Sequence, residues 1–127
     1  LEGLNKDYDT EIVVSEFTWA RVQAHFIGRE IDCVRVVGRE GLVGVHELVA
    51  TREDGVDAET AALLDGFAHA RALYCERRFG EALDAFQALV DRFPKDGPAA
   101  VYLERCRRHA VAPPPAEWDG AHQLVSK

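Results

Sequence analysis

The chain has 127 residues, of which 15 are Lys or Arg and 22 are Asp or Glu, giving a formal net charge of −7. This charge argues against a general nucleic-acid binder, because such proteins present a basic face. Apolar residues make up 47% of the chain, too many for a disordered protein and enough for one ordinary domain or two small substructures. The longest apolar runs fall far short of the roughly 20 residues of a membrane span, so we expect no membrane contact by this segment.

Two residue counts bear on the origin and the compartment of the chain. The sequence contains no Met, so we expect it to be a fragment of a longer protein. The cysteines Cys33, Cys75 and Cys106 are odd in number and form no C-x-x-C pair, which argues against a disulfide framework. Each stands among apolar neighbours, so we predict buried free thiols in a reducing, cytoplasmic compartment. An upstream region could still anchor the parent protein to a membrane.

The first 50 residues predict a small antiparallel sheet that carries one helix. Ser15 is a natural N-cap for a helix from residue 17 to about residue 26. Residues 38–41 have glycine at both ends, which suits the turn of a hairpin. The β-branched and alternating runs around these features are the predicted strands, at residues 10–14, 30–37 and 42–50.

After a polar, acidic connector at residues 51–57, the pattern becomes helical. Apolar residues recur at helical spacing in three segments, at residues 58–78, 81–93 and 98–109. We expect Phe79-Gly80 to break the first helix and Pro98 to lie in the first turn of the third. Four phenylalanines recur on apolar faces and are expected to form structural core: Phe67, Phe79, Phe86 and Phe93. Three consecutive prolines then lead to Trp118 and a short tail.

The helical pair at residues 58–93 resembles a tetratricopeptide repeat. That pattern places small, aromatic and proline residues at fixed positions, here Ala70, Phe79, Ala82, Phe86 and Pro94. Any helical hairpin also needs small residues where its backbones approach and an aromatic residue at its corner. Because one repeat cannot bury its own apolar faces, we expect a single repeat-like hairpin with a capping helix rather than a solenoid.

Motifs for common chemistry are not complete in this sequence. The five histidines form neither H-x-x-x-H nor H-E-x-x-H, and His46 and His69 are better explained as packed or surface residues than as metal ligands. The sequence has no G-x-S-x-G nucleophile motif and no phosphate-binding P-loop. The sequence therefore predicts no complete active site.

Three stretches in the first half, taken in order, resemble the C-terminal part of a class III nucleotide cyclase catalytic domain. Family members typically carry k-x-Y-G-T-x-I-L-V-S-E, then a helix, then R-E-L-D-x-V-x-V-K-G-K and x-Y-E-L. The corresponding strings here are K-D-Y-D-T-E-I-V-V-S-E at residues 6–16, R-E-I-D-C-V-R-V-V-G-R at residues 29–39 and V-H-E-L at residues 45–48. The resemblance covers residues 1–49. Parts of the tail, from Tyr102 to Gly120, resemble the helical extension of many bacterial adenylate cyclases.

The resemblance implies a parent enzyme that converts ATP to cyclic AMP and pyrophosphate in signal transduction. In that family the metal-binding aspartates, the purine-selecting pair and the Asn-x-x-x-Arg motif all lie upstream of the region found here. The reaction uses two Mg²⁺ or Mn²⁺ ions, so the parent would need them while this fragment would bind none. ATP rather than GTP is expected only because it is the more frequent substrate. We therefore expect the fragment alone to scaffold the site and to be catalytically inactive.

Arg39 is the one candidate binding residue that the resemblance suggests. The family hairpin V-K-G-K supplies a lysine to the triphosphate, whereas here Val37 holds the first lysine position and Arg39 the second. An arginine could bind phosphate through two of its N–H groups. The alternative is a solvated turn arginine beside Glu40.

The expected fold class is α+β. Residues 1–50 would form the cyclase segment, with a small antiparallel β part and one packed helix, and residues 51–127 the three-helix, tetratricopeptide-like extension. Two other functions stay open: a non-catalytic helical interaction or dimerisation module, and a cyclase-like pseudoenzyme. An exposed sheet edge is a template for strand pairing, so we also expect a homo-oligomer.

Overall fold

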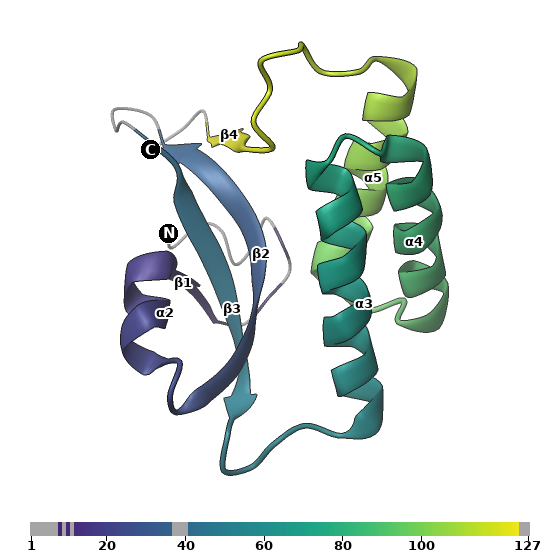
Figure 1. Ribbon diagram of the computed structural model, residues 1–127. Coiled ribbons are helices and arrows are strands. Elements are labelled where there is room, and N and C mark those ends of the chain that lie inside the picture. The colour runs from purple at the N-terminus through teal and green to yellow at the C-terminus, as the bar shows by residue number, and fades with distance from the viewer. Residues whose placement is uncertain (1–7, 9, 11, 37–40, 125–127) are drawn as a thin grey trace. The chain divides into compact units, whose positions relative to one another are not determined.

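The computed structural model describes residues 8, 10, 12–36 and 41–124. These residues form two compact units. The sheet unit comprises the described residues through Val56 together with those from Gly120 onward, and the helical unit is Asp57–Asp119. Strands gather in the first unit and long helices in the second, which confirms the predicted α+β class (Figure 1).

The sheet has four strands in the order β1-β3-β2-β4. Their bounds are β1 Val13–Ser15, β2 Phe26–Val36, β3 Val43–Thr51 and β4 His122–Leu124. The first three pair antiparallel, as predicted, whereas β4 pairs parallel with the end of β2. The sequence predicts only a short tail after Gly120, so β4 is an additional strand. The chain therefore leaves the sheet after β3, forms the helical unit and returns to the sheet.

The helix α2, Glu16–Val22, lies beside β1 and packs against β1 and β3 (Figure 1). Its predicted N-cap is confirmed, because the Ser15 hydroxyl accepts a hydrogen bond from the Thr18 amide at 3.3 Å. The prediction that this helix continues to about Phe26 is wrong. Strand pairing overrides the helical pattern there, since β2 begins at Phe26 opposite Thr51.

A bulge in β2 shapes the core of the sheet unit. Glu30 pairs with His46 and Asp32 pairs with Val45, so Ile31 is the residue that the bulge inserts between these two pairs. The alternation of faces breaks at a bulge. Ile31 and Asp32 are consequently both fully buried, although they are neighbours in the sequence.

The helical unit contains α3, Ala58–Cys75, α4, Phe79–Arg92, and α5, Gly97–Val111 (Figure 1). Asp57 caps α3 through the Thr60 amide, and Pro98 lies in the first turn of α5, as predicted. The predicted break at Phe79-Gly80 is wrong, because α3 already ends at Cys75 and Phe79 begins α4. The chain turns at Arg77, which is the non-glycine residue with a positive φ (65°) among those described.

Aromatic side chains form the core of the helical unit. The Phe67 ring meets Phe86 and Tyr102 edge to face, with centroids 5.7 and 5.5 Å apart, and Phe86 stacks on Tyr102 at 5.0 Å. Such ring pairs are favourable beyond their buried area. The predicted core role of Phe67, Phe79 and Phe86 is confirmed by their burial, whereas Phe93 is only half-buried.

The three cysteines form no disulfide, as predicted, but they are not all buried. Cys106 is buried, Cys33 is partly exposed and Cys75 is exposed at the last position of α3. The prediction of burial is therefore wrong for Cys75, since the buried residue at that helix end is its neighbour Tyr74. Along the described residues, the helices are too short or too polar to cross a membrane.

Candidate functional site

The first buried polar contact of the sheet unit joins Arg29 of β2 to Glu47 of β3. The two residues are directly opposite one another in the ladder, and the Arg29 Nε donates to a Glu47 carboxylate oxygen at 2.8 Å. The arginine side chain is 7% exposed and the glutamate side chain 16%. A charge pair this deep is costly to break, because the remaining charge would stay in a poorly solvated place. The pair therefore holds β2 and β3 in one register.

The second buried polar contact joins Tyr8 to Asp32. The Tyr8 hydroxyl donates to the Asp32 carboxylate, whose other oxygen accepts from the Cys33 amide at 2.8 Å. Tyr8 is 1% exposed and Asp32 is fully buried. Burying a carboxylate is favourable only when its oxygens are hydrogen-bonded, as they are here. This contact ties the segment that precedes β1 to the bulge in β2.

A third set of contacts surrounds α2. The Glu16 carboxylate accepts from the Gly44 amide of β3 at 2.5 Å, continuing the β1–β3 ladder where the chain turns into the helix. The Trp19 ring stacks on His46 at 5.2 Å. Gly28 leaves the room for this ring, because a Cβ there would lie 2.8 Å from a Trp19 ring carbon and 2.5 Å from the Glu47 carbonyl oxygen.

The polar contacts described above stabilise the structure of the sheet unit. The carboxylates of Glu16, Asp32 and Glu47 each accept from a donor within the unit, so they fix backbone and strand register. The described residues include no group of three or more His, Cys, Asp or Glu side chains able to hold a metal ion. Arg39, the predicted triphosphate-binding residue, lies outside the described residues. The arrangement of the three carboxylates and their donors fixes the backbone of the sheet unit.

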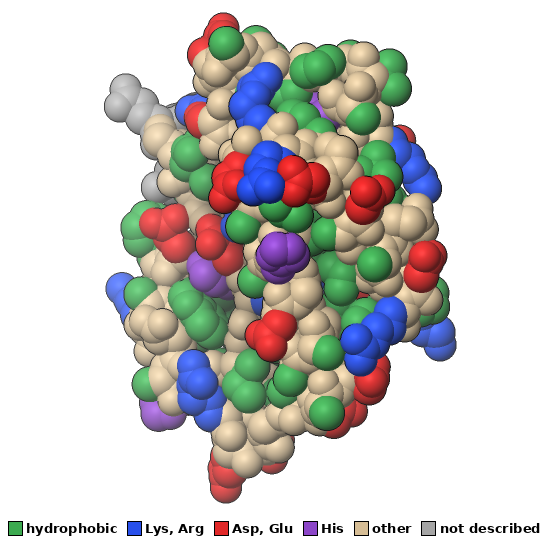
Figure 2. All heavy atoms as spheres, turned by 45° about the vertical axis from the view of Figure 1, so that its right-hand side comes forward, with side chains coloured by type: hydrophobic (Ala, Val, Ile, Leu, Met, Phe, Trp, Pro, Cys, Tyr) green, Lys and Arg blue, Asp and Glu red, His purple; other side chains and the backbone are tan. Residues whose placement is uncertain are grey.

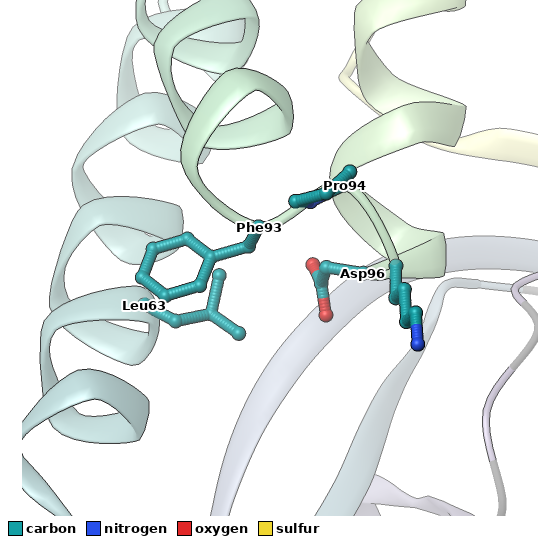
Figure 3. Close-up of a pocket in the computed structure, with 5 residues that line it drawn as sticks. Leu63, Phe93, Pro94 and Asp96 are labelled. Carbon is teal, nitrogen blue, oxygen red and sulfur yellow. The ribbon is translucent and has the colours of Figure 1, made fainter.

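The helical unit has a shallow hollow of about 480 Å³ near the start of α5. The Phe93 ring and the Leu63 side chain lie next to one another there, facing the Asp96 carboxylate (Figure 3). Asp96 is already engaged, because it accepts from the Ala99 amide at 3.2 Å and caps α5. The lining is apolar apart from Asp96 and Lys95, so the hollow offers contact area rather than chemistry.

A second feature of the helical unit is the corner between α3 and α4, which we name the Arg77 corner. It consists of Arg77 with the rings of Tyr74, Phe79 and His109. The chain's own tail lies on it: Arg77 donates to the carbonyl oxygens of Pro114 and Pro115 at 2.7 and 2.9 Å. The Trp118 ring meets the rings of Tyr74, His109 and Phe79 at 5.4, 5.5 and 5.6 Å.

Two groups of α5 have shifted pKa values. Burial lowers the pKa of His109 below its ordinary 6.5, and the nearby Arg108, Arg105 and Arg77 add to this effect. Burial also raises the pKa of the Cys106 thiol to about 11, which Arg105 only partly offsets. His109 is therefore favoured as the neutral imidazole, and Cys106 as the unreactive thiol.

Charges at the surface are mixed in sign. On the face shown in Figure 2, basic side chains lie beside acidic ones, and apolar side chains appear between them. The described ion pairs of the helical unit are exposed, such as Arg78–Glu81 at 2.7 Å and Arg92–Glu59 at 2.9 Å. Exposed pairs contribute little to stability, because water and salt screen their charges.

Comparison with known proteins finds a distant relative. The chain is 27% identical over 108 residues to the terminal-differentiation-specific adenylate cyclase of Dictyostelium discoideum. The chain is thus related to an adenylate cyclase. The match covers 83% of this chain but 5% of the length of that cyclase. No family model matches the chain, and no solved structure matches it either.

The sequence pattern does not predict a role for most of the residues that make these contacts. Arg29, Asp32 and Glu47 lie inside the strings that resemble the cyclase family, but no role follows for them from the pattern alone. A charged residue within a β-branched run was the available signal, because such a residue must be exposed or paired. Arg77 carried no signal, since its importance depends on a tail that is almost 40 residues away in the sequence.

Proposed function

We propose that this chain is the C-terminal part of a class III nucleotide cyclase catalytic domain of bacterial type, followed by a helical extension. The parent would convert ATP to cyclic AMP and pyrophosphate in signal transduction. The single observation that carries the proposal is the way the resembling strings meet in space. The string at residues 29–39 supplies Arg29 and Asp32, and their partners Glu47 and Tyr8 come from the other two strings.

The contribution of this chain would be structural. Paired residues from three separate strings give the sheet a single register, and an enzyme site built on that sheet needs its elements held to within a fraction of an ångström. The metal ions and the transition state would be bound by residues upstream, as in the cyclase family. Arg39 is the residue of this chain that would reach the triphosphate.

The experiment compares this chain with a longer protein that carries the upstream half of the domain. Each is incubated with ATP and Mg²⁺ or Mn²⁺, and cyclic AMP is measured. We expect product from the longer protein and none from the present chain. Cyclic AMP from the chain alone would overturn the assignment of a scaffold role. A longer protein that lacks paired upstream aspartates and forms no product would point to a pseudoenzyme.

Two variants of the longer protein separate structural roles from binding roles. Glu47→Gln should lower the thermal midpoint and the activity together, because the pair with Arg29 orders the sheet. Arg39→Ala should raise the KM for ATP at an unchanged thermal midpoint if the arginine binds phosphate equally in the ground state and the transition state. Unchanged kinetics would leave Arg39 as a turn residue.

A second candidate function is a non-catalytic interaction module formed by the helical unit. The observation that favours it is the Arg77 corner, where the tail of the chain is bound through backbone carbonyls and a ring. A homo-oligomer is proposed as well. Sedimentation at increasing concentration tests this point, and a monomer at every concentration would contradict it.

A further inference from the structure

The tail segment Pro114–Trp118 contacts the Arg77 corner in the manner of a bound peptide. Arg77 holds two successive carbonyl oxygens, and the Trp118 ring fits against Tyr74, Phe79 and His109. Arg77 also lies over the Trp118 ring at 5.7 Å, a distance at which a guanidinium attracts an aromatic face. The corner thus recognises backbone carbonyls and one aromatic side chain. Glu117, which lies between Pro115 and Trp118 in the sequence, is exposed.

The backbone of Arg77 is a second, independent indication. The amides of Arg77 and Arg78 donate back to the carbonyls of Tyr74 and Leu73, the pattern that ends a helix with a left-handed residue. Glycine is the usual residue at that position because a side chain is strained there. In this chain the residue at that position is Arg77, with a φ of 65°. Its side chain donates the hydrogen bonds that hold the tail. Strain of this kind gathers at binding sites.

We propose that the Arg77 corner is a recognition site for proline-rich segments that turn after two consecutive prolines and carry an aromatic residue three positions beyond them, as the tail does through the hydrogen bond from the Trp118 amide to the Pro115 carbonyl. The chain's own Pro114–Trp118 segment occupies the site in this structure and competes with such a partner. Proline suits the site because its ring fixes φ at about −65°, so the backbone that presents the two carbonyls to Arg77 is ordered before binding. This inference does not depend on the cyclase relationship, since every contact lies within the helical unit.

The tether makes the tail a strong competitor. A segment joined to its site by a short linker has an effective concentration on the order of millimolar, which a free partner must exceed. Beyond Trp118 the chain turns at Gly120, whose φ is 87°, and pairs with β2 over only three residues. A partner would therefore bind when the tail is displaced, and the wild-type chain would bind it weakly.

The test uses a fluorescently labelled synthetic peptide of residues 112–119 and the full chain. In fluorescence anisotropy, Trp118→Ala should bind the peptide about tenfold more tightly than the wild type, because its own tail no longer fills the site. Adding Arg77→Gly should abolish this gain, while circular dichroism shows unchanged helicity because glycine suits the turn. Equal binding by the wild type and Trp118→Ala, or binding that survives Arg77→Gly, would overturn the proposal.

A second measurement needs no peptide and tests the hold of Arg77 on the tail if Trp118→Ala does not fold. Trp19→Phe leaves Trp118 as the single tryptophan of the chain. Acrylamide quenching of its fluorescence should rise when Arg77→Gly is added, since the clamp on Pro114 and Pro115 is lost. The matched control is Arg78→Gly, the neighbouring arginine, whose side chain pairs with Glu81 instead and should leave quenching unchanged. Unchanged quenching in Arg77→Gly would contradict the clamp.

Discussion

The sheet unit has buried polar pairs beside its apolar core, whereas the core of the helical unit is built from aromatic rings. Arg29–Glu47 joins β2 to β3 and Tyr8–Asp32 joins Tyr8 to β2 in the first unit, and Phe67, Phe86 and Tyr102 interlock in the second. Polar pairs are directional, so a one-residue slip of a strand would separate both partners. Ring contacts depend mainly on shape and volume. The sheet unit should therefore respond to small changes of charge, and the helical unit to loss of volume.

Each unit carries its own reporter of unfolding. The two tryptophans of the chain are Trp19 in the sheet unit and Trp118 in the helical unit. Trp118→Phe leaves fluorescence from the sheet unit alone, and Trp19→Phe leaves fluorescence from the helical unit alone. Two transitions that differ in midpoint would show that the units unfold separately, and a shared transition would show that they unfold together.

The largest effect is expected for Phe86→Ala. Phe86 is fully buried between Phe67 and Tyr102, and removal of a buried Phe side chain costs roughly 3–5 kcal/mol. Denaturant unfolding followed through Trp118 measures the loss. Phe93→Ala is the matched control and should cost less, because Phe93 is only half-buried. An unchanged midpoint together with lost binding of a partner would favour the interaction module over a core role.

The second largest loss of stability is expected for Glu47→Gln, which tests the buried polar pair of the sheet unit. The substitution keeps the shape of the side chain but removes the negative charge opposite Arg29, which should cost roughly 3 kcal/mol for a pair this deep. Fluorescence of Trp19 reports the loss in urea. Glu81→Gln, followed through Trp118 of its own unit, is the control, because it removes the same charge from the exposed pair with Arg78 and should have little effect. Equal effects of the two substitutions would contradict the structural role of the buried pair.

Local signals predicted much of the helical unit and of α2 correctly. Ser15 and Pro98 mark helix starts through chemistry within one turn, and β3 begins and ends within one residue of its prediction. Such features depend on neighbours in the sequence, which a pattern records.

Features that depend on distant partners could not be predicted. The end of α2 is set by pairing of Phe26 with Thr51, and β4 exists because residues 122–124 meet Val34–Val36 of β2. The turn that follows α3 is made at Arg77 rather than at a glycine, so composition gives no sign of it. For the candidate site, the strings were visible in the sequence, but the pairing of Tyr8 with Asp32 required the bulge at Ile31.

A smaller effect is expected for Gly28→Ala in the sheet unit. The new Cβ would press against the Glu47 carbonyl and the Trp19 ring, and overpacking of this kind costs roughly 1–3 kcal/mol. Gly80→Ala in the first turn of α4 is the control, because open space surrounds that position. It should stabilise the helical unit by about 0.5 kcal/mol through the better helix propensity of Ala. A neutral Gly28→Ala would show that β3 and α2 can move apart at no cost.

The smallest effect is a pH dependence of the helical unit that arises from His109. Burial among Tyr74, Phe79 and Trp118, together with Arg108, Arg105 and Arg77, lowers the pKa of His109 in the folded state. Between that lowered pKa and 6.5, the unfolded chain binds a proton that the folded chain does not. The contribution to stability is therefore present above pH 6.5 and is lost as the pH falls through the folded pKa.

Thermal midpoints of Trp19→Phe at about pH 7.5 and about pH 5.5 measure this loss through Trp118. His109→Gln should lower the midpoint at the higher pH but flatten its fall with acid, because glutamine takes up no proton. His69→Gln removes an exposed histidine of α3 and should keep the fall seen with the native histidines. The pH window also separates this effect from that of Asp57, whose pKa is lowered from 3.8 by its hydrogen bonds to Thr60, so that its contribution is lost only in stronger acid. If the thermal midpoint of His109→Gln still falls near pH 6, another group takes up the proton. The packing of His109 against Trp118 would then not be the source of the pH dependence.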